Sequence, residues 1–216
     1  MGRKYASIHI FTDEQEKVLL KLKNCYYKGN SMETTMHLTS NIFNDVGVQQ
    51  IFERFANLWV NEVLIVQSES FVSIYDESLS FELIEEKAQS LSGNIGEPII
   101  YTSNFDDDVF IFGIFRAGKL ITGGKIGKCL PIYGIDPEII DIDKFCSELS
   151  IKKTSSLESI NTTDEIDVIE DEIEKLLKVS LELTICDIQS ESEHYIESFI
   201  ENRLYVYKKL KTASNY

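Results

Sequence analysis

Basic residues are scarce in this chain: 21 Lys and Arg stand against 36 Asp and Glu in 216 residues, giving a formal net charge of −15. A surface with that excess repels phosphate backbones and anionic lipid, so we expect neither nucleic acid nor a membrane as a partner. The chain also lacks an uncharged apolar stretch of about 20 residues, the length that spans a bilayer. Its first seven residues contain no apolar signal region, and we expect a cytoplasmic protein.

Cysteine and histidine form none of the usual zinc-binding patterns. No two cysteines form a Cys-x-x-Cys pair, and the three histidines lie at no metal-ligand spacing from them. A chain of this size with ample Ile, Leu, Val and Phe does not need disulfides. We therefore expect free, mostly buried thiols and no cofactor. The cysteines are Cys25, Cys129, Cys146 and Cys186.

Motifs for nucleophilic catalysis and for phosphate binding are also missing, which favours a protein that is not an enzyme. No serine lies in a Gly-x-Ser-x-Gly turn. The glycine-rich segment 123–128 lacks the Walker A spacing, because Thr122 stands where the first glycine would be. It predicts a flexible loop, with closure over an anionic ligand as the alternative. For His9 we expect a half-exposed strand residue rather than a general base.

Hydrophobic periodicity predicts an α/β domain over residues 1–135. Alternation of polar and apolar residues predicts strands, and apolar residues at helical spacing predict helices. Segment 109–115 is apolar on both faces, which is typical of a strand buried on both sides. The expected strands are 5–11, 62–67, 70–75, 99–102, 109–115 and 119–122. The expected helices are 13–29, 48–58 and 80–91.

The order of these elements is β-α-(α)-β-β-α-β-β-β, close to the split β-α-β pattern with an added hairpin. We therefore predict an α+β sandwich whose sheet is mixed and largely antiparallel. Residues 136–216 differ in character: we expect an acidic, mainly helical region, either a separate domain or packed on the same core. Its expected elements are helices at 137–149, 165–178 and 191–210, a strand at 181–188 and an exposed linker at 150–164.

One third of the chain resembles a set of uncharacterised bacterial α/β domains. The matching pieces are a strand end at Phe71–Glu77 (FVSIYDE), the apolar run Asp108–Phe115 and the turn Gly118–Leu120. In those domains a W/F-V-S-[V/I]-Y-D-E strand end precedes a helix, a strand and a hairpin. The resemblance supports the α/β fold and implies no site.

The acidic charge is concentrated near the C-terminus, where seven of the eleven residues from Asp164 to Glu174 are Asp or Glu. Like charges at i, i+3 and i+4 on a helix repel one another. A solvated face, the basic tail at 203–211 or a cationic partner each explains the pattern. We expect a non-enzymatic protein-binding module for a basic protein, of which an inhibitor or immunity protein is an example. The carboxylates we expect to bind it are Glu165, Asp167, Glu170, Asp171 and Glu174.

Two alternatives remain open on the sequence. Five carboxylates lie in two turns, one after the expected strand at 70–75 and one after the expected strand at 99–102. If the two turns meet, these carboxylates would suit Mg²⁺ or Ca²⁺, which would indicate a metal-dependent enzyme or ligand-binding domain. Ordinary turn chemistry also explains Asp at these positions. These carboxylates are Asp76, Glu77, Asp106, Asp107 and Asp108. A structural or oligomeric scaffold, associating through the sheet, is the other alternative.

Overall fold

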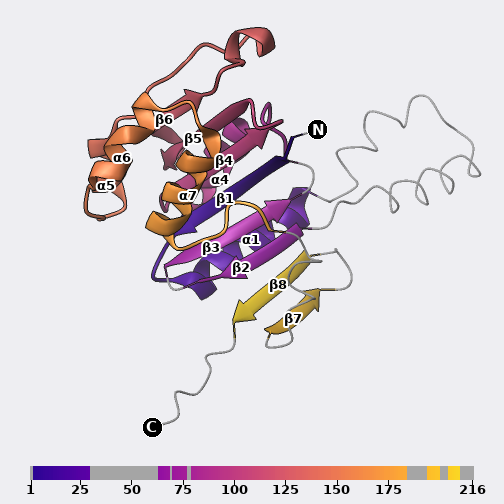
Figure 1. The fold of residues 1–216 in the computed structure, drawn as a ribbon. Coiled ribbons are helices and arrows are strands. Elements are labelled where there is room, and N and C mark those ends of the chain that lie inside the picture. Colours follow the sequence, from indigo (N-terminus) through magenta and orange to yellow (C-terminus); the bar gives the residue numbers. More distant parts are fainter. Residues whose placement is uncertain are drawn as a thin grey trace, which may run out of the picture.

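The computed structural model describes residues 2–29, 63–68, 70–76, 79–183, 194–199 and 204–209, and one sheet of eight strands runs through it (Figure 1). The strands are β1 (Lys4–Phe11), β2 (Val63–Gln67), β3 (Phe71–Asp76), β4 (Ile99–Phe105), β5 (Val109–Arg116), β6 (Lys119–Ile126), β7 (His194–Phe199) and β8 (Leu204–Lys209). The α-helices are α1 (Gln15–Gly29), α4 (Ile84–Ile95), α5 (Ile142–Glu148), α6 (Ser155–Ser159) and α7 (Ile166–Leu177). Two 3₁₀ helices are η1 (Leu130–Tyr133) and η2 (Ile160–Thr162).

The middle of the sheet confirms the predicted split β-α-β order. β4, β1, β3 and β2 lie side by side, and each neighbouring pair is antiparallel. α1 follows β1 and α4 follows β3, as this pattern requires. The predicted hairpin, β5 and β6, extends the sheet beyond β4. At the other edge β8 pairs in parallel with β2, so the sheet is mixed but largely antiparallel, and the fold is α+β.

One face of the sheet packs against α1 and α4. Ile8 and Ile10 of β1 point to this face and are fully buried, together with Leu22 of α1 and Ile84 of α4. The alternation of side chains along a strand explains why these two isoleucines lie on the same face. Val18 and Leu19 of α1 and Ala88 and Leu91 of α4 belong to the same layer and recur at helical spacing.

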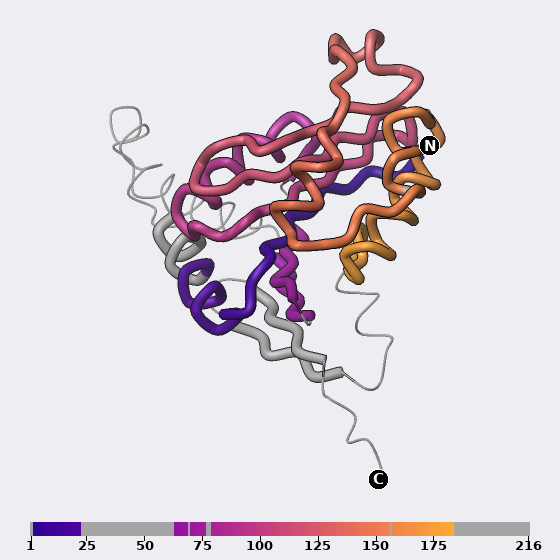
Figure 2. Tube along the Cα trace, turned by 90° about the vertical axis from the view of Figure 1, so that its left-hand side faces the viewer, coloured from indigo at the N-terminus to yellow at the C-terminus, as the bar shows by residue number. Residues whose placement is uncertain are grey.

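The opposite face packs against α5, α6 and α7, so the helices form a layer on each side of the sheet. Phe110 and Phe112 of β5 contact a cluster that includes Phe145 of α5 and Ile169 of α7. Figure 2 shows α1 (indigo) and α7 (orange) on opposite sides of β1. The prediction that residues 150–164 form an exposed linker is wrong, because the segment contains α6 and η2 and buries Leu157 in this cluster.

β5 is buried on both faces, as its apolar sequence predicts. The prediction of a flexible loop at 123–128 is wrong for its glycine pair, because Gly123 and Gly124 belong to the neighbouring strand β6. A side chain at Gly123 would place its Cβ 2.9 Å from the Tyr101 hydroxyl, and one at Gly124 would lie 2.9 Å from the Phe112 ring. These glycines make room for aromatic rings on the two faces of the sheet, which a local sequence pattern does not reveal.

Gly113 of β5 tests this close fit. A Cβ at Gly113 would lie 2.6 Å from both the Thr122 carbonyl oxygen and the Tyr101 hydroxyl. We expect Gly113→Ala to lower the free energy of unfolding by about 3 kcal/mol, because the backbone of β6 has to shift. Gly93→Ala is the control: it is in α4, its nearest neighbour is 3.9 Å away, and alanine favours the helix. Urea denaturation compares the two, and equal stabilities would contradict the packing argument.

The prediction of a long helix at 191–210 is wrong. β7 and β8 occupy most of that range and pair antiparallel with each other. Tyr, Ile, Phe and Val are frequent here and favour strands, and the free edge of β2 gives β8 a pairing partner. Of the strand expected at 181–188, residues 181–183 are not a strand, and the remainder lies outside the described residues. The helix expected at 48–58 also lies outside them.

The helix expected at 137–149 begins only at Ile142. Glu138 exchanges two backbone hydrogen bonds with Lys125, at 2.9 and 3.2 Å. It therefore pairs with the outer edge of β6 as an isolated antiparallel bridge instead of starting a helix. Asp141 then caps α5 by accepting a hydrogen bond from the Lys144 amide. Asn161 holds this segment in place, because its side chain bonds the amide and the carbonyl of Ile140 at 3.1 and 2.8 Å.

Candidate functional site

The acidic helix α7 places one carboxylate inside the protein. Ile166, Ile169, Ile173 and Leu177 form its buried stripe, and Glu170 lies on the same side at 5% exposure. The spacing of three and four residues puts all five side chains on one helix face. An acidic residue on an apolar stripe needs polar partners in the layer beneath it.

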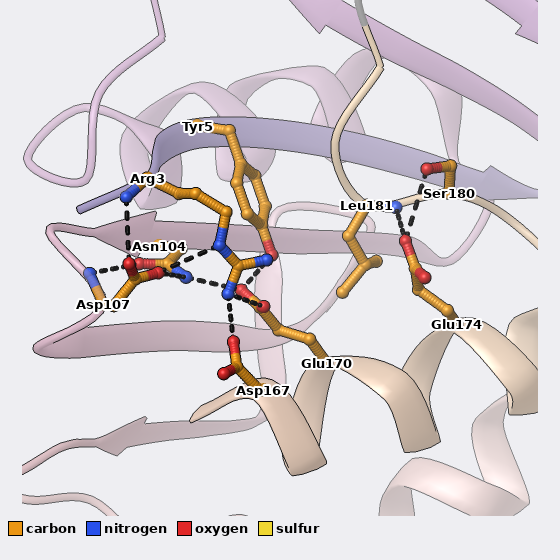
Figure 3. A network of polar contacts seen from close by, with 9 residues as sticks. All are labelled: Arg3, Tyr5, Asn104, Asp107, Asp167, Glu170, Glu174, Ser180 and Leu181. Carbon is orange, nitrogen blue, oxygen red and sulfur yellow. Dashed lines mark hydrogen bonds and ion pairs between the residues drawn. The ribbon is translucent and has the colours of Figure 1, made fainter. Parts of the chain in front are cut away.

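Arg3 is the cationic partner of Glu170. Its guanidinium lies 2.8 Å from Glu170 Oε2 and 3.0 Å from Asp107 Oδ1, and it also contacts Asp167 (Figure 3). Burial by itself lowers the pKa of Arg3, but these three carboxylates together raise it above its ordinary value. One cation therefore links the start of β1, the β4–β5 turn and α7.

Two neutral donors complete the environment of Glu170. The Tyr5 hydroxyl donates to Glu170 Oε1 at 2.5 Å, and the Asn104 amide donates to the same oxygen at 2.7 Å. Burial, followed by the nearby charge of Glu170, raises the pKa of Tyr5 well above its usual range, so its hydroxyl stays protonated. Asn104 also accepts a hydrogen bond from the Asp107 amide at 3.0 Å, which fixes the turn that presents Asp107 to Arg3.

A second polar cluster lies on the same face of the sheet around His9. The His9 ring lies 2.8 Å from Ser73 Oγ and 3.0 Å from Ser7 Oγ, and Ser7 Oγ is 2.8 Å from the Thr102 hydroxyl. Ser7 donates its proton to the Leu181 carbonyl at 2.7 Å, so it accepts from His9. This assigns the ring proton to Nε2 and leaves Nδ1 to accept from Ser73.

His9 is completely buried, at 0% exposure, which corrects the expectation of a half-exposed residue. Burial lowers the pKa of His9 to about 3, and the ring is neutral at physiological pH. Although Ser73 and His9 are within hydrogen-bond distance, both are inaccessible to a substrate, and both ring nitrogens face serine hydroxyls rather than an orienting carboxylate. The cluster therefore holds the layers together rather than providing a nucleophile.

The chain that leaves α7 packs against the His9 cluster. Glu174 Oε1 accepts a hydrogen bond from the Leu181 amide at 2.6 Å, and Ser180 donates to the same oxygen at 3.3 Å (Figure 3). The Tyr75 hydroxyl donates to the Ser180 carbonyl at 2.5 Å. Residues 180–181 therefore tie the end of α7 to β1 and β3.

The five carboxylates expected to bind a partner fall into two groups. Glu170 uses both carboxylate oxygens within the chain and is too buried to reach a partner. Glu174 is half-buried and accepts through Oε1 from the Leu181 amide. Glu165, Asp167 and Asp171 are exposed. Among the described residues, the counterions of this region come from Arg3, Lys128 and Lys175. The basic tail named as an alternative reaches the described structure only in β8, which pairs with β2.

Four of the five candidate metal ligands lie in the described part of the chain, and these four do not form one metal site. Asp106 and Asp107 adopt the left-handed backbone conformation of a tight turn, and their carboxylates face Lys4 and Arg3. Asp108 accepts from Cys129 at 3.4 Å, and Asp76 is buried at the end of β3. Within the ranges that the structure describes, no three such side chains could hold a metal ion. Glu77 lies outside those ranges.

Three residues of the network around Glu170 were not singled out from the sequence: Arg3, Tyr5 and Asn104. A signal for Tyr5 was available, because Tyr5, Ser7 and His9 alternate with apolar residues in β1 and so share one face. Glu170 was also recognisable as the acidic member of an isoleucine stripe. The contact of Arg3 with Glu170 joins residues that are distant in sequence, and no local pattern predicts it.

Three general findings complete the description. None of the helices in the described part of the chain is long and apolar enough to cross a bilayer. Cys129 and Cys146 are free thiols, the latter buried, whereas Cys186 lies outside the described residues and the side chain of Cys25 is not described. Comparisons with known protein families, with curated proteins and with solved structures found no match.

Proposed function

We propose that this protein is a non-enzymatic cytoplasmic module that binds a basic protein, as an inhibitor or immunity protein would. Its binding surface is the outer side of α7 together with the two residues before it, which we call the acidic surface. This surface comprises Asp164, Glu165, Asp167, Asp171 and Glu172.

The observation that carries the proposal is that cations on this surface are shared. Arg3 contacts three carboxylates, and Lys128 and Lys175 contact two each. Carboxylates therefore outnumber their counterions even after folding, and the remaining negative charge attracts a cationic partner. Val168 is half-exposed among these acids and offers an apolar contact within the charged surface.

Charge reversal on the acidic surface tests the proposal. The partner is first recovered from a lysate by carbodiimide crosslinking, which joins carboxylates to lysines, then identified by mass spectrometry and purified. We expect the double variant Asp164→Lys/Asp171→Lys to slow association at least tenfold at low salt, because electrostatic steering is lost. Stopped-flow or surface plasmon resonance measurements at rising salt give the association rates.

The matched control is Asp13→Lys/Glu14→Lys, which makes the same change in net charge at two exposed positions just before α1, the helix on the other face of the sheet. We expect this control to retain most of the association rate and its salt dependence. Equal slowing in both double variants would mean that net charge alone matters. That result, or no slowing in either, would contradict an acidic binding surface on α7.

A further inference from the structure

An arm of the chain projects beyond the layers next to the acidic surface. The arm comprises residues 127–139, which follow β6 directly. A bridge between Lys125 of β6 and Glu138 closes its base (Figures 1 and 2). Within it the Ile132 amide donates to the Cys129 carbonyl at 2.9 Å, and the Ile135 amide donates to the Leu130 carbonyl at 3.0 Å. The first bond belongs to η1, and the second closes the turn after it, where Gly134 adopts the left-handed conformation. The arm is thus ordered by its own backbone.

The arm turns two isoleucines toward solvent. Leu130 and Tyr133 are three residues apart, so they share one side of η1, and both pack inward, Tyr133 against the Phe105 ring. Ile132 is consequently directed outward and is 80% exposed. Ile139 is 75% exposed, because its neighbour Ile140 takes the buried position. They are the two most exposed large apolar side chains in the described part of the chain.

The root of the arm touches the acidic surface directly. Lys128 Nζ lies 2.9 Å from Glu165 and 3.8 Å from Asp164, immediately before α7. The arm itself carries Asp136 and Glu138, both exposed. Apolar side chains that are surrounded by carboxylates fit a partner surface on which apolar depressions are surrounded by Lys and Arg.

We propose that the arm is the apolar anchor of the interface with the basic protein: Ile132 and Ile139 insert into its surface while the carboxylates guide its approach. This inference rests on the proposed function and specifies the partner further, as a basic protein with an apolar depression within its basic surface. The arm is ordered before binding, so little conformational entropy is lost when it docks. A few well-buried apolar contacts of this kind dominate the affinity of protein interfaces.

Site-specific photocrosslinking tests the arm even before the partner is identified. Benzoylphenylalanine replaces Ile132 or Ile139 in the full chain. In control proteins it replaces Leu20, exposed on α1, or Leu120, exposed at the end of β6 that is farther along the chain from the arm. We expect positions 132 and 139 to capture in a lysate the same basic protein that carbodiimide joins to the acidic surface. Capture of a second copy of this chain, or equal yields at the control positions, would overturn the proposal.

Kinetics with the purified partner separate this inference from the proposed function. We expect Ile132→Ser/Ile139→Ser to speed dissociation at least tenfold while the salt dependence of association stays unchanged. The charge-reversal variant slows association instead. If the serine variant dissociates at the wild-type rate, the arm is not the anchor, even where charge reversal has its expected effect. If only the serine variant weakens binding, the acidic surface fails and the arm alone contacts the partner. Thermal melts of both variants check that the fold is retained.

Discussion

Replacing Glu170 with alanine is expected to lower the free energy of unfolding by about 3–5 kcal/mol. The substitution removes the acceptor of two buried hydrogen bonds, from Tyr5 and Asn104, and leaves Arg3 without its buried partner. Unsatisfied buried donors cost about 1–3 kcal/mol each, so Tyr5 and Asn104 account for most of the expected loss. The side chain of Arg3 is 42% exposed and keeps its contacts with Asp107 and Asp167. Urea denaturation of the wild type and the variant measures the difference.

Two further variants make this result specific to the contacts of Glu170. Glu170→Gln retains an oxygen acceptor for Tyr5 and loses the ion pair, so we expect an intermediate loss of about 1–2 kcal/mol. Asp171→Ala is the matched control on the next residue of α7. Asp171 pairs with the exposed Lys175 at 3.9 Å, and such surface pairs contribute about 0–1 kcal/mol. If Glu170→Ala and Asp171→Ala have equal effects, the network of Arg3 does not hold α7 on the sheet.

Acidification is expected to destabilise the protein through His9. Burial lowers the pKa of His9 from 6.5 to about 3, so between these values the unfolded chain binds a proton that the folded chain excludes. Stability therefore rises with pH across this window and is lost as pH falls through it. With a pKa of about 6.5 in the unfolded chain, the contribution of His9 falls by about 2 kcal/mol between pH 8 and pH 5.

The variant His9→Gln isolates this contribution. We expect it to be less stable than the wild type at pH 8, because glutamine does not reproduce both contacts with Ser7 and Ser73. The gap should then narrow by about 2 kcal/mol at pH 5, since glutamine does not titrate. Every carboxylate and the other histidines are common to both proteins and cancel in the comparison. A constant gap between pH 8 and pH 5 would show that His9 is accessible to protons in the folded state.

Much of the fold was predictable because it depends on local periodicity. The alternation in β1, the two apolar faces of β5 and the apolar stripe of α4 each identify an element from a short window of sequence. The order of those elements, with their connections, restricted the sheet to the split β-α-β arrangement with an added hairpin, which the structure confirms.

The failures occur where a neighbour in space decides the conformation. Gly123 and Gly124 are typical of a loop, yet the rings of Tyr101 and Phe112 need the space that these glycines leave in β6. The residues of β8 fit a helix or a strand, and the edge of β2 decides for the strand. Residues 150–164 are polar enough for a linker, but Leu157 finds an apolar cluster beneath it.

The sequence by itself determined the charge of this protein and the helical stripe of α7. Only the tertiary structure decided which carboxylates remain available: Glu170 turns to Arg3, whereas Asp171, one position later, turns to solvent. It also decided that His9 is buried and that Ile132 is exposed. The reason is physical: charge and periodicity are properties of a chain segment, whereas burial and ion pairing depend on residues that folding brings together from distant segments.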